Sequence, residues 1–337
     1  MRLTRLSGVL ASVMTIAVAT ARGQDAKLVE AAKKEGGKVV VYGSIENDTM
    51  DLIGAAFKKK TGLDVDFWRA SATKVMDRAI SEFRSGKPLY DVVLTITPPM
   101  EFMFNEGALA SYDSPSARFF PKEVMHPKLG PQYRNSVIGV VYHAGMIKPA
   151  DAPKSLEDLL KPQYRGKVVM PDASQHTTTA QWLASLHKIM GKERADRFIR
   201  DLAATKPLLV ESLTPAGERI TTGETPIGIA FLKNVVFYGQ KGIPLDYVRL
   251  GKFMGDGHGV ALAAKAPRVN AGKAFIDYFL GEEGLKIMAG VGEFVTRKGI
   301  YPPLPGADRI ELVEMVDMDK KAYAEKMAEY RKIFLQQ

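Results

Sequence analysis

The sequence contains no cysteine. This absence excludes disulfide bonds, thiolate nucleophiles, iron–sulfur ligation and zinc sites built from cysteine. It also excludes the lipid anchor that bacterial lipoproteins carry on a cysteine. Histidine is scarce, with five residues in 337, and no two of them stand at a spacing typical of metal ligands.

Aromatic and basic residues do not form the pattern of a nucleic-acid groove. Trp68 and Trp182 are the two tryptophans, and no stretch alternates basic with aromatic side chains. The formal charge of +9 comes from 47 basic and 38 acidic residues, and the one lysine run, 58–60, stands at a predicted helix end where cations favour the helix dipole. We therefore predict no nucleic-acid partner.

What is present is the composition of a globular protein. Hydrophobic residues make up 46 % of the chain and charged residues 25 %, which excludes a disordered or coiled-coil chain. A length of 337 residues suggests about two domains.

The N-terminal residues have the pattern of a signal peptide. Two arginines among the first five residues precede an apolar stretch over 6–21, which ends in small residues. The stretch is interrupted by serine and threonine, and it is shorter than the ~20 apolar residues of a membrane-spanning helix. We expect the segment 1–23 to be removed by a cut between Ala21 and Gly23, and the mature protein to be periplasmic.

The rest of the chain alternates predicted strands with predicted helices. The strands are expected at 38–43, 63–68, 91–94, 137–143, 167–171, 207–210, 226–231, 246–250 and 260–264. The helices are expected to end before Gly62, Gly86 and Gly191, to begin at Pro98-Pro99, and to cover 192–203, 215–222, 267–280 and 311–335. Such alternation predicts parallel βαβ units.

Polar junctions follow several of these strands. In parallel sheets the ligand lies beyond the carboxyl ends of the strands, where the N-termini of helices present free N–H groups. The same residue types also cap helices for purely structural reasons. The junctions lie at 44–47, 69–73, 95–97, 174–178 and 256–258.

Signatures of enzymes are absent. The sequence has no Gly-x-Ser-x-Gly, no His-Glu-x-x-His and no Walker loop. Gly255-x-Gly257-x-Gly259 lacks the spacing of a dinucleotide fingerprint, and we interpret it as a tight turn or a close approach of backbone to a ligand. We predict a protein that is not an enzyme and has no cofactor, and we keep a secreted enzyme as the alternative of another class.

Six short segments follow one another as they do in a known family. They are 39–43 (Val-Val-Val-Tyr-Gly), 57–62 (Phe-x-x-x-Thr-Gly), 90–93, 164–168, 223–230 and 274–280. With these segments the chain resembles the periplasmic substrate-binding proteins of ABC importers, in the extracellular solute-binding family 1 group that includes the ferric-iron binders.

The resemblance implies an α/β fold of two lobes, the type II periplasmic binding protein fold, with a mainly parallel sheet flanked by helices in each lobe. Two crossover strands are expected at about 137–143 and 254–262. Lobe one would then comprise 24–135 and 263–337, and lobe two 136–262. The resemblance also implies a monomer that closes on a small solute and is recognised by an inner-membrane permease. A sensor receptor in place of the permease stays an alternative.

The ferric members of the family place adjacent tyrosines shortly after a Gly-Ile-Ala-type strand. Here Val235 and Val236 occupy those positions, and Tyr238 is the nearest phenol. Iron binding without the tyrosine pair remains an alternative, for which the candidate metal ligands are Glu46, His176, Tyr238 and His258.

An organic anion, such as a carboxylate or a phosphonate, is favoured as the solute. Lys233, Arg69 and several helix N-termini would hold it through charge-assisted hydrogen bonds. Trp182 is expected in the core. For Trp68, a place in the core and a place lining the cleft are equally consistent with the sequence. The predicted ligand-binding residues are Ser44, Glu46, Asn47, Arg69, Ser71, Thr95, Thr97, Ser174, His176, Thr177, Lys233, Asn234, Asp256 and His258.

Overall fold

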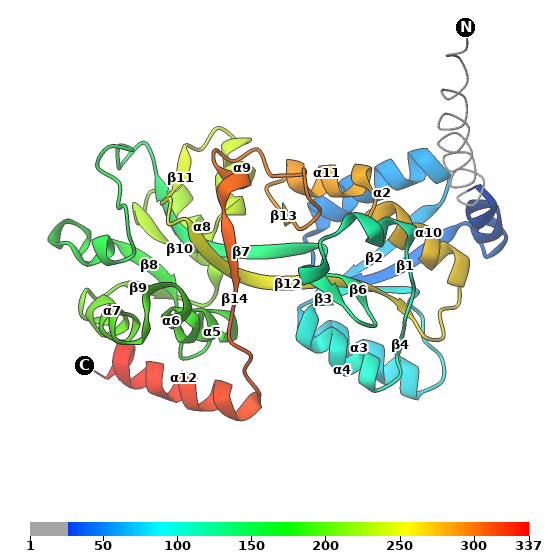
Figure 1. Cartoon of the computed structure of the whole chain (residues 1–337), viewed down its shortest axis with the longest axis horizontal. Helices are drawn as coiled ribbons and strands as arrows, with labels where there is room; N and C mark the ends of the chain where they lie inside the picture. Colours follow the sequence, from blue (N-terminus) through cyan, green and yellow to red (C-terminus); the bar gives the residue numbers. More distant parts are fainter. Residues whose placement is uncertain (1–25, 337) are drawn as a thin grey trace, which may run out of the picture. The chain divides into compact units, whose positions relative to one another are not determined.

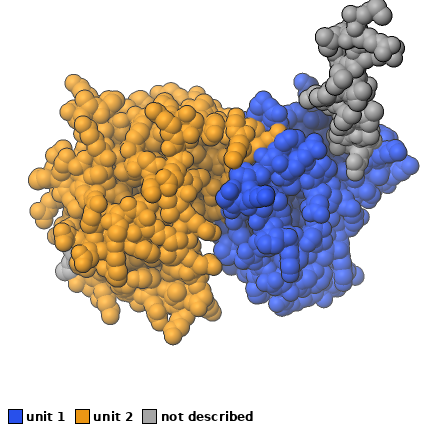
Figure 2. All heavy atoms as spheres, viewed as in Figure 1, with its two compact units in different colours: residues 1–133, 258–287 blue, residues 134–257, 288–337 orange. Residues whose placement is uncertain are grey.

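The computed structural model describes residues 26–336, which form two compact units (Figure 2). Unit 1 contains the described residues up to Tyr133 together with 258–287, and unit 2 contains 134–257 and 288–336. The chain passes from one unit to the other after residues 133, 257 and 287. The predicted signal peptide lies outside the described residues.

The C-terminal segment belongs to unit 2, whereas the sequence-based expectation groups it with lobe one. Its helix α12 (Lys320–Leu335) packs on α5 (Thr177–Ser185) and α7 (Lys192–Ala204), and Tyr330 is buried in that interface. The apolar stripe of α12 predicts burial against some lobe, but a stripe cannot specify which one.

Unit 1 is built on three parallel strands. β1 (Lys38–Gly43) lies between β2 (Asp64–Arg69) and β3 (Val92–Ile96), and β12 (Lys252–Ala263) runs antiparallel to β3. Figure 1 shows α3 and α4 on one face of this sheet and α2 and α10 on the other. A helix over 26–34 opens the described part of unit 1. The further helices and short elements of unit 1 are α2 (Asn47–Thr61), α3 (Ala72–Arg84), α4 (Thr97–Asn105), β4 (Leu109–Ala110), η1 (Pro115–Phe119), η2 (Lys122–Val124), β5 (Met125–His126), β6 (Gly130–Pro131) and α10 (Val269–Phe279), and α11 (Glu282–Gly290) begins there.

Local sequence explains the helices of unit 1. α2 buries Ile53 and Phe57, carries three lysines in its last turn and ends at Gly62, whose φ of 77° is the left-handed conformation that glycine adopts without strain. The predicted strands and helices of this unit are confirmed within a few residues, except that β12 begins eight residues before the strand predicted at 260–264. The helix over 26–34 and α11 are not predicted.

Unit 2 has the same plan. β8 (Val168–Pro171) pairs in parallel with β9 (Leu208–Val210) and β10 (Ile227–Phe231), and β7 (Arg134–His143) is antiparallel to β10. Its further elements are η3 (Glu157–Leu160), η4 (Pro162–Tyr164), α5, α6 (His187–Met190), α7, α8 (Leu213–Thr221), α9 (Lys233–Gly239), β11 (Leu245–Tyr247), β13 (Phe294–Val295), η5 (Ala307–Arg309), β14 (Glu311–Glu314) and α12.

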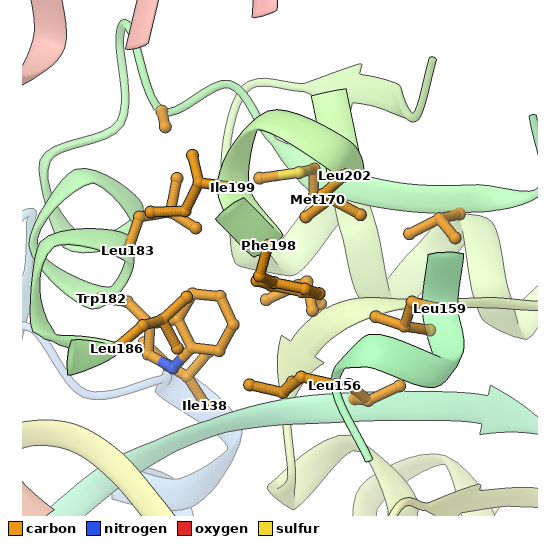
Figure 3. Packing of buried hydrophobic residues seen from close by; sticks show 14 of the residues in the cluster. Ile138, Leu156, Leu159, Met170, Trp182, Leu183, Leu186, Phe198, Ile199 and Leu202 are labelled. Carbon is orange, nitrogen blue, oxygen red and sulfur yellow. The ribbon is translucent and has the colours of Figure 1, made fainter. Parts of the chain in front are cut away.

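Both faces of the unit 2 sheet are buried. Along β8, Val168 and Met170 enter a core under α5, α7 and α12, while Val169 enters a second core under α8 and α9. Figure 3 shows the first core, in which Trp182 lies beside Leu186 and Ile138. Trp182 is 2 % exposed, so its predicted place in the core is confirmed.

Two regions differ from the predicted elements. Residues 311–314, predicted as helix, form the strand β14 beside β12, and α12 begins only after Asp319, whose side chain accepts a hydrogen bond from Ala322 N. β12 runs unbroken through the glycine run at 255–259. A Cβ at Gly255 would lie 2.4 Å from the backbone oxygen of Ser136 on β7, so a larger residue would not fit at this position. Gly255 therefore permits close approach of two strands.

Candidate functional site

The carboxyl ends of the unit 1 strands bring several predicted residues to one edge. Gly43 pairs with Arg69 of β2 and with Leu94 of β3, so the residues that follow stand side by side. Ser44 Oγ and Thr95 Oγ1 are 3.4 Å apart. His258 of β12 is in register with Ile96 at this same edge, where it is buried and 6 % exposed.

Two helices begin at this edge without a side-chain cap. α2 follows Glu46 and α4 follows Ile96, and neither preceding side chain caps its helix. Helix α3 differs, because Ser71 Oγ accepts a hydrogen bond from Lys74 N and so acts as the cap. Because Pro98 and Pro99 in the first turn of α4 have no N–H, the N-terminus of α2 is the better anion donor of the two. Of the other predicted residues, Glu46, Asn47 and Arg69 are exposed and Thr97 is half-buried.

The loop after β8 forms part of the corresponding edge of unit 2. Asp172 accepts hydrogen bonds from Ser174 N and Gln175 Nε2, which orders the loop. Ser174 Oγ is buried and has no hydrogen-bond partner among the described residues. His176 Nδ1 accepts a hydrogen bond from Thr179 N and caps α5, and burial lowers the pKa of His176, so its ring is neutral at physiological pH. Thr177 is exposed.

Lys233 is held by an ion-pair cluster that the sequence does not predict. Its Nζ lies 3.1 Å from Glu293 Oε1, and Arg134 Nη1 pairs with the same oxygen. The side chains of Arg134 and Glu293 are both 2 % exposed. The three residues are far apart in the sequence, and no motif marks Arg134 or Glu293 as part of a site.

Asn234, a predicted ligand contact, faces helix α8. Its Nδ2 has no hydrogen-bond partner among the described residues, and a Cβ at Gly217 of α8 would lie 2.1 Å from it. The absence of a side chain at Gly217 is what makes room for this amide. Asn234 is 7 % exposed, so the structure gives it a packing position more than an open one.

Asp256 lies beside the start of α5. Thr178 Oγ1 donates to Asp256 Oδ2 over 3.2 Å, and the carboxyl group is half-buried. Desolvation raises its pKa from the ordinary value of 3.8 to about 6, and the hydrogen bond from Thr178 offsets only part of that rise. At neutral pH the carboxylate is thus ionised at a cost to the folded state.

This cost predicts how Asp256→Asn affects stability. The folded protein binds the Asp256 proton more tightly than the unfolded chain, so the wild type loses stability as the pH rises from about 4 to about 6. Asparagine can accept the Thr178 hydrogen bond without a charge. We expect Asp256→Asn to raise the free energy of unfolding by about 1–3 kcal/mol above pH ~6, and the gain to vanish below pH ~4. Urea unfolding of both proteins across this range is the measurement, and a variant less stable than wild type at neutral pH would contradict it.

Trp68 belongs to an aromatic cluster in unit 1. The Arg78 guanidinium lies 4.3 Å from the Trp68 ring centre and 4.4 Å from that of Tyr42. Arg78 Nε and Tyr42 OH both donate to Glu82 Oε1. These contacts give half-buried Trp68 a packing role, and its predicted capacity to line a cleft stays a prediction.

The candidate metal ligands are not grouped. Within residues 26–336 no cluster of three or more histidine, aspartate or glutamate side chains could hold a metal ion. Glu46 and His258 belong to unit 1, whereas His176 and Tyr238 belong to unit 2. The Tyr238 ring packs on Phe237, and burial raises the pKa of its phenol, which disfavours a phenolate. Val235 and Val236, at the family's tyrosine positions, lie in α9.

Two cavities lie away from these edges. One, of about 1040 Å³, is in unit 1 between the end of α2 and α11, and the other, of about 500 Å³, is in unit 2 near Arg194 and Lys252. Neither is lined by a predicted ligand-binding residue. Across the described part of the chain, no helix has the length and apolar character needed to span a membrane.

Comparison with known proteins finds similarity to bacterial solute-binding proteins. Residues 38–292 match the family model described as "Bacterial extracellular solute-binding protein". A probable ABC transporter periplasmic-binding protein of Sinorhizobium fredii, y4fP, is 24 % identical over 266 residues, which cover 74 % of this chain and 70 % of that protein.

Solved structures show the fold. Iron-bound HitA from Pseudomonas aeruginosa is 20 % identical with a TM-score of 0.67, covering 89 % of this chain and 98 % of that one. The periplasmic binding protein AfuA from Actinobacillus pleuropneumoniae, with fructose-6-phosphate bound, is 19 % identical with a TM-score of 0.62, covering 89 % and 97 %. The predicted fold class, the two-lobe type II periplasmic binding protein fold, is confirmed by this likeness.

Proposed function

Because this chain belongs to the bacterial extracellular solute-binding protein family, we propose that it is the periplasmic component of an ABC importer and that it captures a small organic anion. It is exported by its signal peptide, closes its two lobes on the solute and presents the closed form to a membrane permease. It acts as a monomer. It needs no cofactor, because capture and release of a solute require no chemical step.

One observation carries the choice of an anion. β1 and β3 are neighbours in the unit 1 sheet, and each leads into a helix that begins without a side-chain cap. The first turn of α2 thus directs backbone N–H groups to the edge where the Ser44 and Thr95 hydroxyls meet, whereas α4 adds few donors because Pro98 and Pro99 have no N–H. Backbone donors, hydroxyls and the partial positive charge of a helix N-terminus suit a carboxylate or a phosphorus oxyanion.

Residues of unit 2 support the same choice. Lys233 is the first residue of α9, two positions after the end of β10, and Glu293 holds its ammonium in one orientation. A lysine oriented in advance loses less side-chain entropy when it binds an acid group than a freely moving lysine does. Ser174 supplies a buried hydroxyl without a protein partner at the same edge. AfuA, on the same fold, has a sugar phosphate bound, which gives precedent for a phosphorylated ligand.

Calorimetry with a set of small anions tests the proposal. We expect the purified mature protein to bind at least one carboxylate, phosphonate or sugar phosphate, and Lys233→Met to weaken that binding by about 1.5–3 kcal/mol, as expected for a lost hydrogen bond to a charged group. Lys241→Met is the matched control, because Lys241 is a lysine of the same unit that lies over the Phe237 ring. Equal losses in both variants would reject the role of Lys233. Binding of ferric salts in place of every organic anion would favour the iron alternative, for which iron-bound HitA is the precedent.

A further inference from the structure

One face of α5 carries a carboxylate and an aromatic ring from two distant parts of the chain. Thr178 and Gln181 are three residues apart, so their side chains lie on the same face of the helix. Thr178 Oγ1 donates to Asp256 of β12 over 3.2 Å, and Tyr323 OH of α12 donates to Gln181 Oε1 over 2.9 Å. Asp256 and Tyr323 are thereby held at neighbouring positions.

The carboxylate of Asp256 has no counter-ion among the described residues. No lysine, arginine or histidine among residues 26–336 forms an ion pair with Asp256, whose hydrogen bond comes from the neutral Thr178 hydroxyl. A carboxylate can accept about four hydrogen bonds, so most of its capacity is unused. A half-buried carboxylate without a counter-ion destabilises the folded protein. Such a group is unusual unless a ligand supplies the missing partner.

The Tyr323 side chain completes the surroundings of this group. It is half-buried, and burial together with the negative charge of Asp256 raises its pKa to about 12, so the phenol is neutral. A neutral aromatic ring next to a carboxylate is an environment that stabilises an ammonium ion, through charge on one side and the ring face on the other.

The position of Asp256 constrains the solute. Thr178 follows the loop that contains Ser174 and His176, so Asp256 stands at the edge of unit 2 that we assign to the anion. Like charges repel, so a carboxylate at this edge suits a solute that carries a positive group as well as its acid group.

We infer that the solute is a small zwitterion, with its acid group on the anion-binding residues and its ammonium group on Asp256, Thr178 and Tyr323. This inference rests on the proposed function and adds the substrate class. It also makes Asp256 and Tyr323 determinants of specificity, and Tyr323 comes from the C-terminal helix, whose sequence carries no binding motif.

Matched pairs of ligands test the inference. Calorimetry would compare 2-aminoethylphosphonate with ethylphosphonate, and 4-aminobutyrate with butyrate. We expect the amino member of at least one pair to bind about tenfold or more tightly than its amine-free partner, as one charge-assisted contact allows. Asp256→Asn should remove this preference without lowering the affinity for the amine-free member, because the variant loses a carboxylate that repels an anion. Tyr323→Ala should reduce the preference, whereas Tyr323→Phe, which keeps the ring, should retain most of it.

The controls separate this inference from the proposed function. Asp196→Asn removes one negative charge from an exposed position on α7 and should leave the preference intact. Equal binding of both members of every pair would overturn the zwitterion while the anion proposal stands. A loss of affinity in Asp256→Asn that is equal for both members would assign Asp256 a structural role and overturn its part in specificity. If no anion of either kind binds, the proposed function fails and the inference fails with it.

Discussion

We expect Glu293→Gln to lower the free energy of unfolding of unit 2 by about 3–5 kcal/mol. Arg134 is 2 % exposed and pairs with Glu293, whose carboxylate also accepts a hydrogen bond from Lys233. Glutamine has nearly the same shape but no charge, so the Arg134 guanidinium would stay buried opposite a neutral amide. Removing one partner of a buried ion pair is costly because the other charge keeps its full desolvation penalty.

The two tryptophans make this measurable for one unit at a time. Trp182 lies in the core of unit 2 and Trp68 in unit 1, so a Trp68→Phe background leaves Trp182 fluorescence as the reporter of unit 2. Guanidinium unfolding at neutral pH would be compared with Glu311→Gln, which breaks the exposed pair with Lys252 and should cost at most about 1 kcal/mol. The double variant Glu293→Gln/Arg134→Met should recover part of the loss. A single Glu293→Gln variant as stable as the control would refute a buried ion pair at this place.

In unit 1 the largest effect is expected for Asp91→Asn, about 3–5 kcal/mol of destabilisation. The Asp91 side chain is fully buried, and its oxygens accept hydrogen bonds from Val40 N, Arg268 N and Arg268 Nε, the last over 2.7 Å. Burial raises the pKa of Asp91 although each of these donors lowers it. An asparagine amide would direct its own N–H groups at one of these donors and leave Arg268 without a counter-charge.

Trp68 fluorescence in a Trp182→Phe background would follow the unfolding of unit 1. The matched control is Asp66→Asn on β2, which removes an exposed partner of Lys38 and should change stability by less than about 1 kcal/mol. If Asp91→Asn and Asp66→Asn were equally stable, the hydrogen bonds that join β1, β3 and the start of α10 through Asp91 would not contribute as argued.

Local sequence was sufficient for much of the fold. β-branched runs such as Val39–Val41 favour buried strands, and a helix that reaches a glycine such as Gly62 ends there because that residue adopts a positive φ. The alternation of these elements, and their resemblance to one family, gave the parallel sheets and the fold class. The assignment of residues 288–336 to unit 2 and the strand β14 could not be predicted from local sequence, because both depend on which surface a segment packs against.

For the candidate site, too, the positions of polar residues could be predicted from the sequence, whereas their contacts could not. Junction residues such as Ser44, Thr95 and Ser174 could be located from the sequence, because the ends of parallel strands share one edge. The sequence could not reveal that Glu293 holds Lys233, that Asn234 packs on Gly217, or that Tyr323 stands beside Asp256.

The sequence by itself thus determined the order of strands and helices, the edges where polar residues gather and the family. Only the tertiary structure decided the partners of each charged side chain, because residues as far apart in the sequence as Asp91 and Arg268, or Arg134 and Glu293, become neighbours through packing. Hydrophobic periodicity is a property of short segments, whereas desolvation and ion pairing depend on everything that surrounds a group, so the second cannot be deduced from the first.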